Sequence, residues 1–351
     1  SPVNTGLTSL AADPCQGAAP TSNANLRAVC IAQGAPAGTI GLILPPSAAQ
    51  ANATSGGNLN LKPEKSDSYT VGFVFQPDFV PGLSITVDYY HIKINGAISQ
   101  PTVGDAIAAC FANISASSAT DPNCTQIRRN PVTGGLDGSP ATTPGLFLAA
   151  SNLGTILTDG IDVGANYRRN LGFAKLNLSF QGNWTNRALF RATPTSVNRE
   201  CVGFYSANCG SPGSAGPSSS PGSLQPKYSW NQRSTLTFGP VDVSVLWRHI
   251  SSMQAEPGSG QRFAGTIKSG ALAGTKVDFG HIPAYNYIDL ATRFDVSDNL
   301  DLTLTVTNLF DKKPPLVGGS IGSTAYDSGN TYPSTYDALG RRFAVGARLK
   351  F

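Results

Sequence analysis

The sequence predicts an all-β fold made of antiparallel strands. Apolar and polar residues alternate with a period of two in nine segments, only 13% of the 351 residues are charged, and Gly (38) and Pro (25) are abundant. A period of two places every second side chain on the same face of a strand. Frequent Gly and Pro disfavour long helices, while 40% hydrophobic residues is enough to build a folded protein.

Four strands are expected in the first half of the chain, each with one apolar and one polar face: residues 69–75, 83–94, 146–168 and 175–185. The fourth is the clearest, because Leu176, Leu178 and Phe180 share one face while Lys, Asn and Ser side chains occupy the other. In the second strand, the apolar residues change parity at Ile92.

Five more strands are expected in the second half: residues 230–238, 241–248, 288–295, 301–307 and 343–351. In the last of them Phe343, Val345 and Leu349 lie on one face and basic side chains lie on the other. The sequence then ends on Phe351, directly after this alternating segment.

The connections between these strands alternate between two sizes. Tight turns are expected at residues 77–82, 169–173, 239–240 and 297–299, and long connections at 97–143, 189–225, 254–283 and 311–340, with residues 1–67 as a long leading segment. Structureless loops beyond about 12–15 residues are uncommon in compact domains. An antiparallel transmembrane β-barrel has short periplasmic turns, long extracellular loops, an apolar outer face and a polar lumen. We therefore expect a segment of such a barrel.

Aromatic residues gather at or near the ends of the expected strands. In a barrel such residues form girdles at the two membrane interfaces. The residues assigned to girdles are Tyr69, Phe75, Tyr89, Tyr167, Trp184, Trp230, Phe238, Trp247, Tyr287, Phe294 and Phe351.

Several other classes of protein are disfavoured. No segment approaches the roughly 18–20 consecutive apolar residues of a membrane-spanning helix. The net charge of +4 is spread along the chain without a basic run, so no nucleic-acid partner is expected. No H-E-x-x-H occurs in the sequence, and "GSGQRFAG" at 258–265 lacks the G-x-G-x-x-G spacing, so we expect neither an enzyme nor a cofactor.

The six cysteines fall as neighbouring pairs inside the expected long segments. About fifteen pairings are open to six cysteines, and local pairing is the simplest. Folding in an oxidising compartment would then join Cys15 to Cys30, Cys110 to Cys124 and Cys201 to Cys209. A zinc site is less favoured, because there is no C-x-x-C and the three histidines lie far apart in the sequence.

Several stretches resemble the C-terminal β-barrel portion of a TonB-dependent outer-membrane receptor. They are "LNLKPEKSDSYTVGFVFQP", "GLSITVDYYHIKINGAIS", "NLGTILTDGIDVGANY", "YIDLATRFDVSDNLDLTLTVTNLFDKKPP" and "RRFAVGARLKF". The resemblance is specific in "PEKSDSYTVGF", "DYYHIKI", "NLFDKKPP" and the final aromatic residue, and it does not extend to the loops.

The resemblance implies an integral receptor in the outer membrane of a Gram-negative bacterium, with its strands in lipid and its loops extracellular. It would bind a scarce nutrient, such as a metal chelate, a siderophore or a saccharide, and import it with energy from an inner-membrane coupling protein. The terminal strand with Phe343, Val345, Leu349 and Phe351 resembles the signal that the barrel-assembly machinery reads.

The resemblance also implies that these residues are one part of a longer molecule. Receptors of this kind have barrels of about 22 strands and a plugged lumen. We therefore expect a C-terminal fragment that lacks the plug and about thirteen strands. Residues 1–67 are expected to form an extracellular loop leading into the barrel, and residues 68–351 its C-terminal strands and loops.

The candidate ligand-contacting residues lie in two of the long loops. Arg199, Phe204 and Tyr205 lie around the third cysteine pair, and Tyr326, Tyr332 and Tyr336 lie in the last loop. Ordinary loop packing is the alternative role for each of them.

Two other functions stay open at this point. A passive diffusion porin would show a constricting loop inside the lumen and no plug upstream. A surface adhesin or a soluble β-sandwich would bury its apolar strand faces against each other, and it would not need detergent for extraction.

Overall fold

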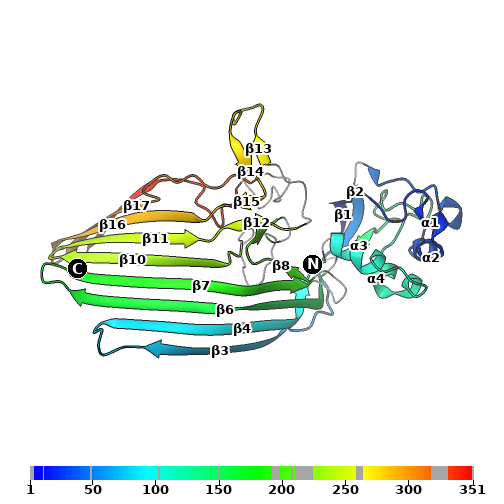
Figure 1. The fold of residues 1–351 in the computed structure, drawn as a ribbon. Helices are drawn as coiled ribbons and strands as arrows, with labels where there is room; N and C mark the ends of the chain where they lie inside the picture. Colours follow the sequence, from blue (N-terminus) through cyan, green and yellow to red (C-terminus); the bar gives the residue numbers. More distant parts are fainter. Residues whose placement is uncertain are drawn as a thin grey trace. The chain divides into compact units, whose positions relative to one another are not determined.

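The computed structural model describes residues 4–10, 12–47, 50–101, 103–148, 150–191, 198–206, 209, 224–257, 264–317 and 331–349 (Figure 1). Two compact units are present, and each is described by itself. The first unit contains residues 1–66, 94–156 and 191–198, and the second contains residues 67–93, 157–190 and 199–351.

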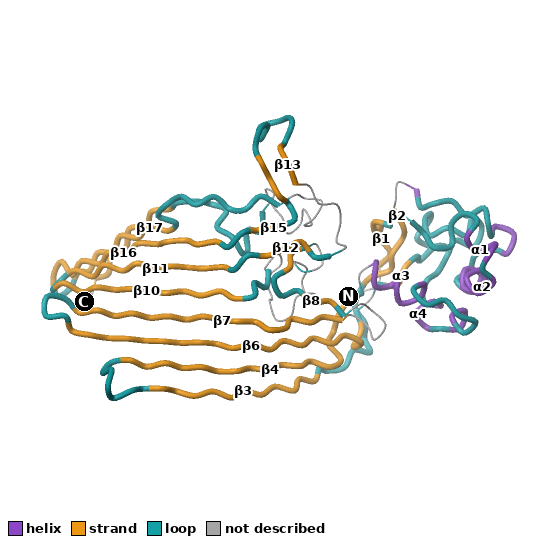
Figure 2. Tube along the Cα trace, in the orientation of Figure 1, coloured by secondary structure: helices purple, strands orange, loops and turns teal. Residues whose placement is uncertain are grey.

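Nine long strands form one antiparallel sheet in which every strand is paired with its neighbours along the chain. This confirms the nine expected strands. Figure 2 shows them side by side, with the connecting loops at their ends. In order across the sheet they are β3 (Lys65–Phe75), β4 (Leu83–Ser99), β6 (Ser151–Asn170), β7 (Lys175–Arg191), β10 (Tyr228–Phe238), β11 (Val241–Ile250), β16 (Tyr285–Ser297), β17 (Leu300–Thr307) and β18 (Arg342–Leu349).

The sheet is open, as expected for part of a barrel. Its path begins at β3 and ends at β18, and these two strands do not pair with each other. Tight turns join β3 to β4, β6 to β7, β10 to β11 and β16 to β17, where the sequence predicts them. In the first of these turns Gly82 has a φ of +86°, and a Cβ atom there would lie 2.2 Å from the Arg168 carbonyl oxygen, so the turn requires glycine.

The pairing register keeps the apolar residues on one face of the sheet. Val245 pairs with Leu290, Leu290 with Val306, and Val306 with Phe343, so one apolar row crosses four strands. These side chains face outward from the sheet: Phe343 is 74% exposed and Val245 is 37% exposed. A water-soluble sandwich would bury such a row, whereas a barrel wall exposes it to lipid.

The opposite face is polar and internally paired. Asp242 pairs with Arg293 across β11 and β16, and their charged groups lie 3.4 Å apart. Arg248 and Asp289 occupy the same face, with two hydrogen bonds of 2.9 and 3.0 Å. The alternation in the sequence thus produces one apolar and one polar wall.

The first unit contains strands and helices of its own. It combines a three-stranded sheet with short helices, and no described helix of the chain is long and apolar enough to cross a membrane. Its elements are β1 (Asn4–Ser9), α1 (Ala19–Ser22), α2 (Ala24–Ala32), η1 (Ala37–Thr39), β2 (Gln50–Ser55), α3 (Val103–Phe111), η3 (Ser118–Thr120), α4 (Pro122–Thr125) and β5 (Leu146–Phe147).

Side-chain caps define where two of these helices begin. The Asn23 side chain accepts a hydrogen bond from the Leu26 backbone N–H at the start of α2 (3.0 Å). The Asp121 side chain accepts one from the Asn123 N–H at the start of α4 (2.8 Å), and Pro122 occupies the first helical position. Both arrangements satisfy N–H groups that have no partner inside the helix.

A buried ion pair joins distant segments at the centre of the first unit. Arg129 donates two hydrogen bonds to the Asp13 carboxylate (2.5 and 2.8 Å), and neither side chain is exposed to solvent. The Arg129 Nε group also donates to the Gln33 side chain (2.7 Å), and Gln33 donates to the Cys124 carbonyl oxygen (3.2 Å). Because each charged group has its partners, burial of the pair is tolerated.

Disulfides staple the same region. Cys15 is bonded to Cys30 and Cys110 to Cys124, which are the local pairs expected from the sequence. All four sulfur-bearing side chains are buried. The expected leading segment therefore folds together with residues 94–156, because the ion pair and the apolar core need contributions from both.

The remaining strands lie in the long connections of the second unit. Among them β12 pairs with β15 and with β9, and β13 pairs with β14, while β8 pairs with β7 of the long sheet. They are β8 (Arg199–Glu200), β9 (Phe204–Tyr205), β12 (Met253–Ala255), β13 (Ala264–Thr266), β14 (Lys276–Asp278) and β15 (His281–Ile282).

We predict that Arg129→Met destabilises the first unit by about 3–5 kcal/mol, because it leaves the Asp13 carboxylate buried without its partner. Arg128→Met is the matched control, since Arg128 is the adjacent residue and its side chain is exposed. Native-state hydrogen exchange of residues 24–32 measures the effect. Equal protection in the two variants would contradict this role for the ion pair.

Candidate functional site

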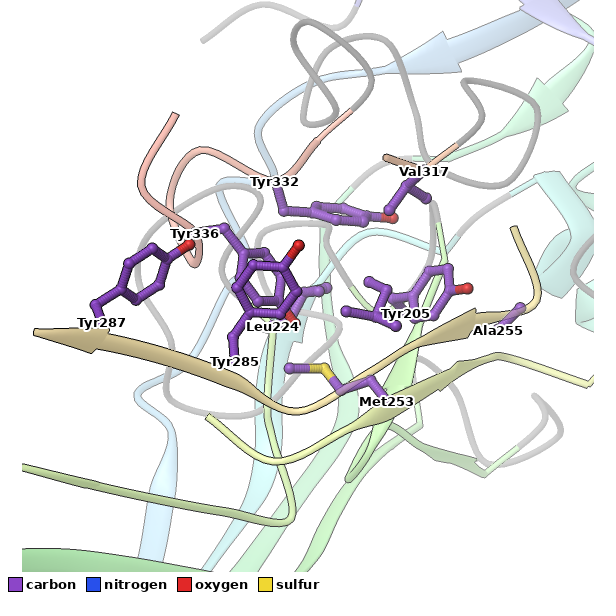
Figure 3. Packing of buried hydrophobic residues seen from close by; sticks show 10 residues of the cluster. Tyr205, Leu224, Met253, Ala255, Tyr285, Tyr287, Val317, Tyr332 and Tyr336 are labelled. Atoms are coloured by element: carbon purple, nitrogen blue, oxygen red, sulfur yellow. The ribbon is translucent and has the colours of Figure 1, made fainter. Parts of the chain in front are cut away.

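Three of the long connections converge on a tyrosine-rich core in the second unit. The residues of this loop core share nearly complete burial: Tyr205, Leu224, Met253, Ala255, Ile282, Tyr285, Tyr287, Val317, Tyr332 and Tyr336. Figure 3 shows their side chains. Tyr285 and Tyr287 lie at the start of sheet strand β16, so the loop core is attached to the wall.

Backbone pairing brings these loops together. β12 is the central strand of a small sheet, antiparallel to β15 and parallel to β9. Gln254 therefore pairs with both His281 and Phe204, which lie far from it in the sequence. The connection between β7 and β10 and the connection between β11 and β16 are thus joined by backbone hydrogen bonds.

Ring contacts complete the core. Tyr285 and Tyr336 meet edge to face with ring centroids 5.1 Å apart, and Tyr205 and Tyr332 do so at 6.3 Å. The Tyr205 hydroxyl donates to the Phe279 carbonyl oxygen (2.7 Å). Such aromatic pairs contribute about 0.5–1.5 kcal/mol each beyond their burial.

A polar network lies at the base of the loop core. Asp289 accepts two hydrogen bonds from Arg248 and one from the Asn308 backbone N–H (2.7 Å). The Arg248 guanidinium also lies 5.0 Å from the centre of the Tyr287 ring. Because Arg248 pairs with Tyr287 in the register, the loop core stands on the polar face of the sheet.

The segment after β17 is clamped by one side chain. Asn308 has a φ of +54°, accepts a hydrogen bond from the Lys312 N–H (2.8 Å) and donates to the Lys312 carbonyl oxygen (3.0 Å). Asparagine tolerates this left-handed conformation better than most residues. The clamp places the Lys312 ammonium 5.1 Å from the centre of the Tyr285 ring. The "NLFDKK" stretch therefore orients the base of the last loop.

Burial determines the protonation state of Tyr336 in the last loop. Tyr336 is 1% exposed, and desolvation raises the pKa of its phenol, with a smaller contribution from Tyr287. Its hydroxyl has no hydrogen-bond partner within the described residues. The phenol of Tyr336 is therefore neutral and held by packing alone.

The structure describes five of the six candidate ligand-contacting residues. Arg199 lies in β8 and pairs with Glu256 (2.8 Å), which also accepts a hydrogen bond from Ser206 (2.6 Å). Phe204 is half-buried against the third disulfide, between Cys201 and Cys209. Tyr326 lies outside the described residues.

The other three candidates, Tyr205, Tyr332 and Tyr336, are buried in the loop core. In this structure they hold the loops together and present almost no surface, so their direct contact with a ligand stays a prediction. The sequence did not predict that the segments around these tyrosines contact one another, because the composition of a loop does not indicate which other segment it pairs with. Only the third cysteine pair pointed to an ordered loop.

The assignment of Tyr287 to an outer aromatic girdle is wrong. Its side chain is 1% exposed within the loop core and lies on the polar face. The neighbouring Ile288 pairs with Trp247 on the apolar face, so the parity of position 287 already placed Tyr287 on the other side.

The terminal strand presents an exposed apolar row. Phe343, Val345 and Leu349 are 74%, 76% and 61% exposed. Phe351 lies outside the described residues. The role of these four residues as an assembly signal stays a prediction.

An antiparallel meander with an exposed apolar face, a polar opposite face and long folded loops at one end is the wall of a transmembrane β-barrel. Comparison with protein families identifies the barrel. Residues 18–309 match the family described as "TonB dependent receptor-like, beta-barrel", and the chain belongs to this family.

Solved structures show the same fold. A variant of the ferric enterobactin receptor PfeA from Pseudomonas aeruginosa, in complex with enterobactin, is 15% identical with a TM-score of 0.52 and aligns with 86% of this chain and 33% of its own. A second variant of that receptor is 14% identical with a TM-score of 0.50 over the same shares. This chain thus spans about a third of the length of these proteins. No curated protein matches the sequence.

We predict opposite effects for two identical substitutions in the loop core. Tyr205→Phe removes a hydrogen bond and should lower the free energy of unfolding of the loops by about 1 kcal/mol. Tyr336→Phe removes a hydroxyl that has no partner in the described chain, so it should leave stability unchanged or raise it by up to about 1 kcal/mol. Hydrogen exchange of residues 253–255 and 331–337 measures both. Equal losses in the two variants would contradict these assignments.

We also predict that the loop core loses stability as the pH rises above about 10. Because burial raises the pKa of Tyr336, its phenol keeps its proton in the folded loop, whereas the unfolded chain releases it near pH 10. Below that pH the phenol is neutral in both states and contributes no pH dependence. The loss attributable to Tyr336 should approach about 1.4 kcal/mol per pH unit. Hydrogen exchange between pH 9 and 11, roughly the range around the ordinary tyrosine pKa, should show a steeper loss in the native protein than in Tyr336→Phe.

Proposed function

We propose that this chain is the C-terminal part of an outer-membrane receptor of a Gram-negative bacterium. In this proposal the receptor binds a scarce nutrient at its extracellular loops and imports it with energy from an inner-membrane coupling protein. Family membership supports the proposal, as does the similarity of the fold to that of the ferric enterobactin receptor of Pseudomonas aeruginosa. Energy coupling would act through the part of the receptor that precedes these residues.

The loop core is the observation that carries the proposal. A pore for passive diffusion needs no ordered surface at its mouth, whereas a receptor gains affinity when its loops are fixed before the ligand arrives. Here strand pairing, aromatic contacts and a disulfide fix the loops. Arg199 and Phe204 are the candidates that this core leaves partly accessible for contact with a ligand.

The proposal also assigns an orientation. The long connections would face the outside and the tight turns the periplasm, with the apolar face in lipid. Disulfides form in the oxidising periplasm during export, which agrees with one disulfide in the leading segment and two in the long connections. The row of Phe343, Val345 and Leu349 would present the assembly signal to the barrel-assembly machinery.

We predict energy-dependent accumulation with loop-dependent binding. Cells that produce the protein as its gene encodes it would be offered radiolabelled ferric enterobactin and radiolabelled maltotriose. A protonophore should abolish accumulation of the nutrient but leave its surface binding intact. Tyr332→Ala should weaken binding at least about tenfold, because loss of a buried aromatic ring loosens the loops. Phe173→Ala, at an exposed position beside the β6–β7 turn, is the control.

Two outcomes would contradict this function. Entry that is unsaturable and insensitive to the protonophore would indicate a passive porin. Release of the protein from membranes without detergent would indicate an adhesin or a soluble module.

A further inference from the structure

A groove of about 390 Å³ crosses four strands on the polar face of the sheet, apart from the loop core. Its lining includes carboxylates, amides and hydroxyls from Thr86, Asp88, Asp162, Gln181, Asn183, Ser229 and Asn231, together with Val163, Gly164, Gly182 and Trp230. They come from β4, β6, β7 and β10, so the rigid wall and not a loop positions them.

Glycines make room for the side chains of β4 along this groove. A Cβ atom at Gly72 would lie 1.9 Å from the Asp88 carboxylate oxygen, and one at Gly164 would lie 2.5 Å from the Thr86 hydroxyl. At Gly160 a Cβ atom would lie 2.5 Å from the Tyr90 hydroxyl. Side chains at these three positions would push the β4 residues out of place, so the groove depends on glycine on both sides of β4.

One amide orients the middle of the groove. The Asn183 side chain donates to the Asp162 carboxylate (2.7 Å) and to the Tyr90 hydroxyl (3.2 Å), and its oxygen accepts from Thr185 (2.8 Å). With both ends of Asn183 engaged, the Asp162 carboxylate is held in one orientation. Its remaining acceptor positions stay open to a ligand.

The charges of the groove select among ligand classes. Within the described residues that line it there are two carboxylates and no lysine or arginine. Elsewhere on this face, Asp289 pairs with Arg248, and Asp242 and Asp295 both lie near Arg293. The groove therefore repels an anionic chelate, whereas its acceptors and amide donors fit a molecule rich in hydroxyl groups.

We infer that this groove is a binding subsite for a neutral saccharide in the lumen of the receptor. Sugar hydroxyls donate to the Asp88 and Asp162 carboxylates and accept from the amides of Gln181 and Asn231. The inference deepens the proposed function and rests on it, since it names the class of nutrient for the same molecule.

The test measures binding to the purified protein, as its gene encodes it, in detergent. Isothermal titration would use glucose, maltotriose, cellotriose and xylotriose, with ferric enterobactin as an anionic comparison. At least one saccharide should bind, and Asp162→Ala and Asn183→Ala should each weaken that binding about tenfold or more. Asn177→Ala is the matched control, because Asn177 is an exposed asparagine on the same face of the same strand and lies outside the groove. The heat-dependent gel shift of each variant would report that the barrel has folded.

The inference is overturned if none of the four saccharides binds, or if Asp162→Ala and Asn183→Ala bind them as well as the native protein. Uptake by cells separates this result from a failure of the proposed function. If cells import ferric enterobactin in a protonophore-sensitive way and the groove variants do not alter this import, the saccharide subsite is contradicted but the receptor function is supported. If saccharide binding depends on the groove residues but cells show no energy-dependent accumulation, the subsite is supported and the transport function is contradicted.

Discussion

The structure depends on one constraint: a pairing register that holds the apolar residues of successive strands on one face of the sheet. A slip of one residue in any pair would turn the apolar row of that strand toward the polar side and its charged row toward lipid. The row from Val245 through Leu290 and Val306 to Phe343 shows that the register is kept across four strands. The sheet therefore has one face suited to lipid and one polar face, and the loop core and the groove both lie on the polar face.

The polar face can carry function because its charges are satisfied locally. Arg248, Asp289 and Asn308 form a connected network at the base of the loop core, and Arg293 lies between two aspartates nearer the tight turns. A buried or half-buried charge without such partners would be costly. Against this balanced background, a groove lined by two carboxylates and no base has a distinct chemical preference.

Order in the long connections comes from several independent devices, because flexible segments of this length lose much conformational entropy when they fold. The first unit uses two disulfides and the pair between Asp13 and Arg129. The loop core uses the small sheet centred on β12, a third disulfide and buried tyrosines. In each case the contacts join residues that are far apart in the sequence, which is why composition alone described these segments only as long and polar.

The sequence by itself determined the barrel wall: the nine strands, the tight turns between them, the local disulfide pairs and the family. These features rest on short-range rules, namely a period of two, turn residues and cysteine spacing. Only the tertiary structure decided that Tyr285 and Tyr287 support the loops, that Arg129 closes the first unit, and that glycines on β3 and β6 make room for a groove beside β4. These three features depend on which distant segments come into contact. The pattern of residues along the sequence predicts which face of a strand a side chain occupies, but it does not predict which residue the side chain contacts there.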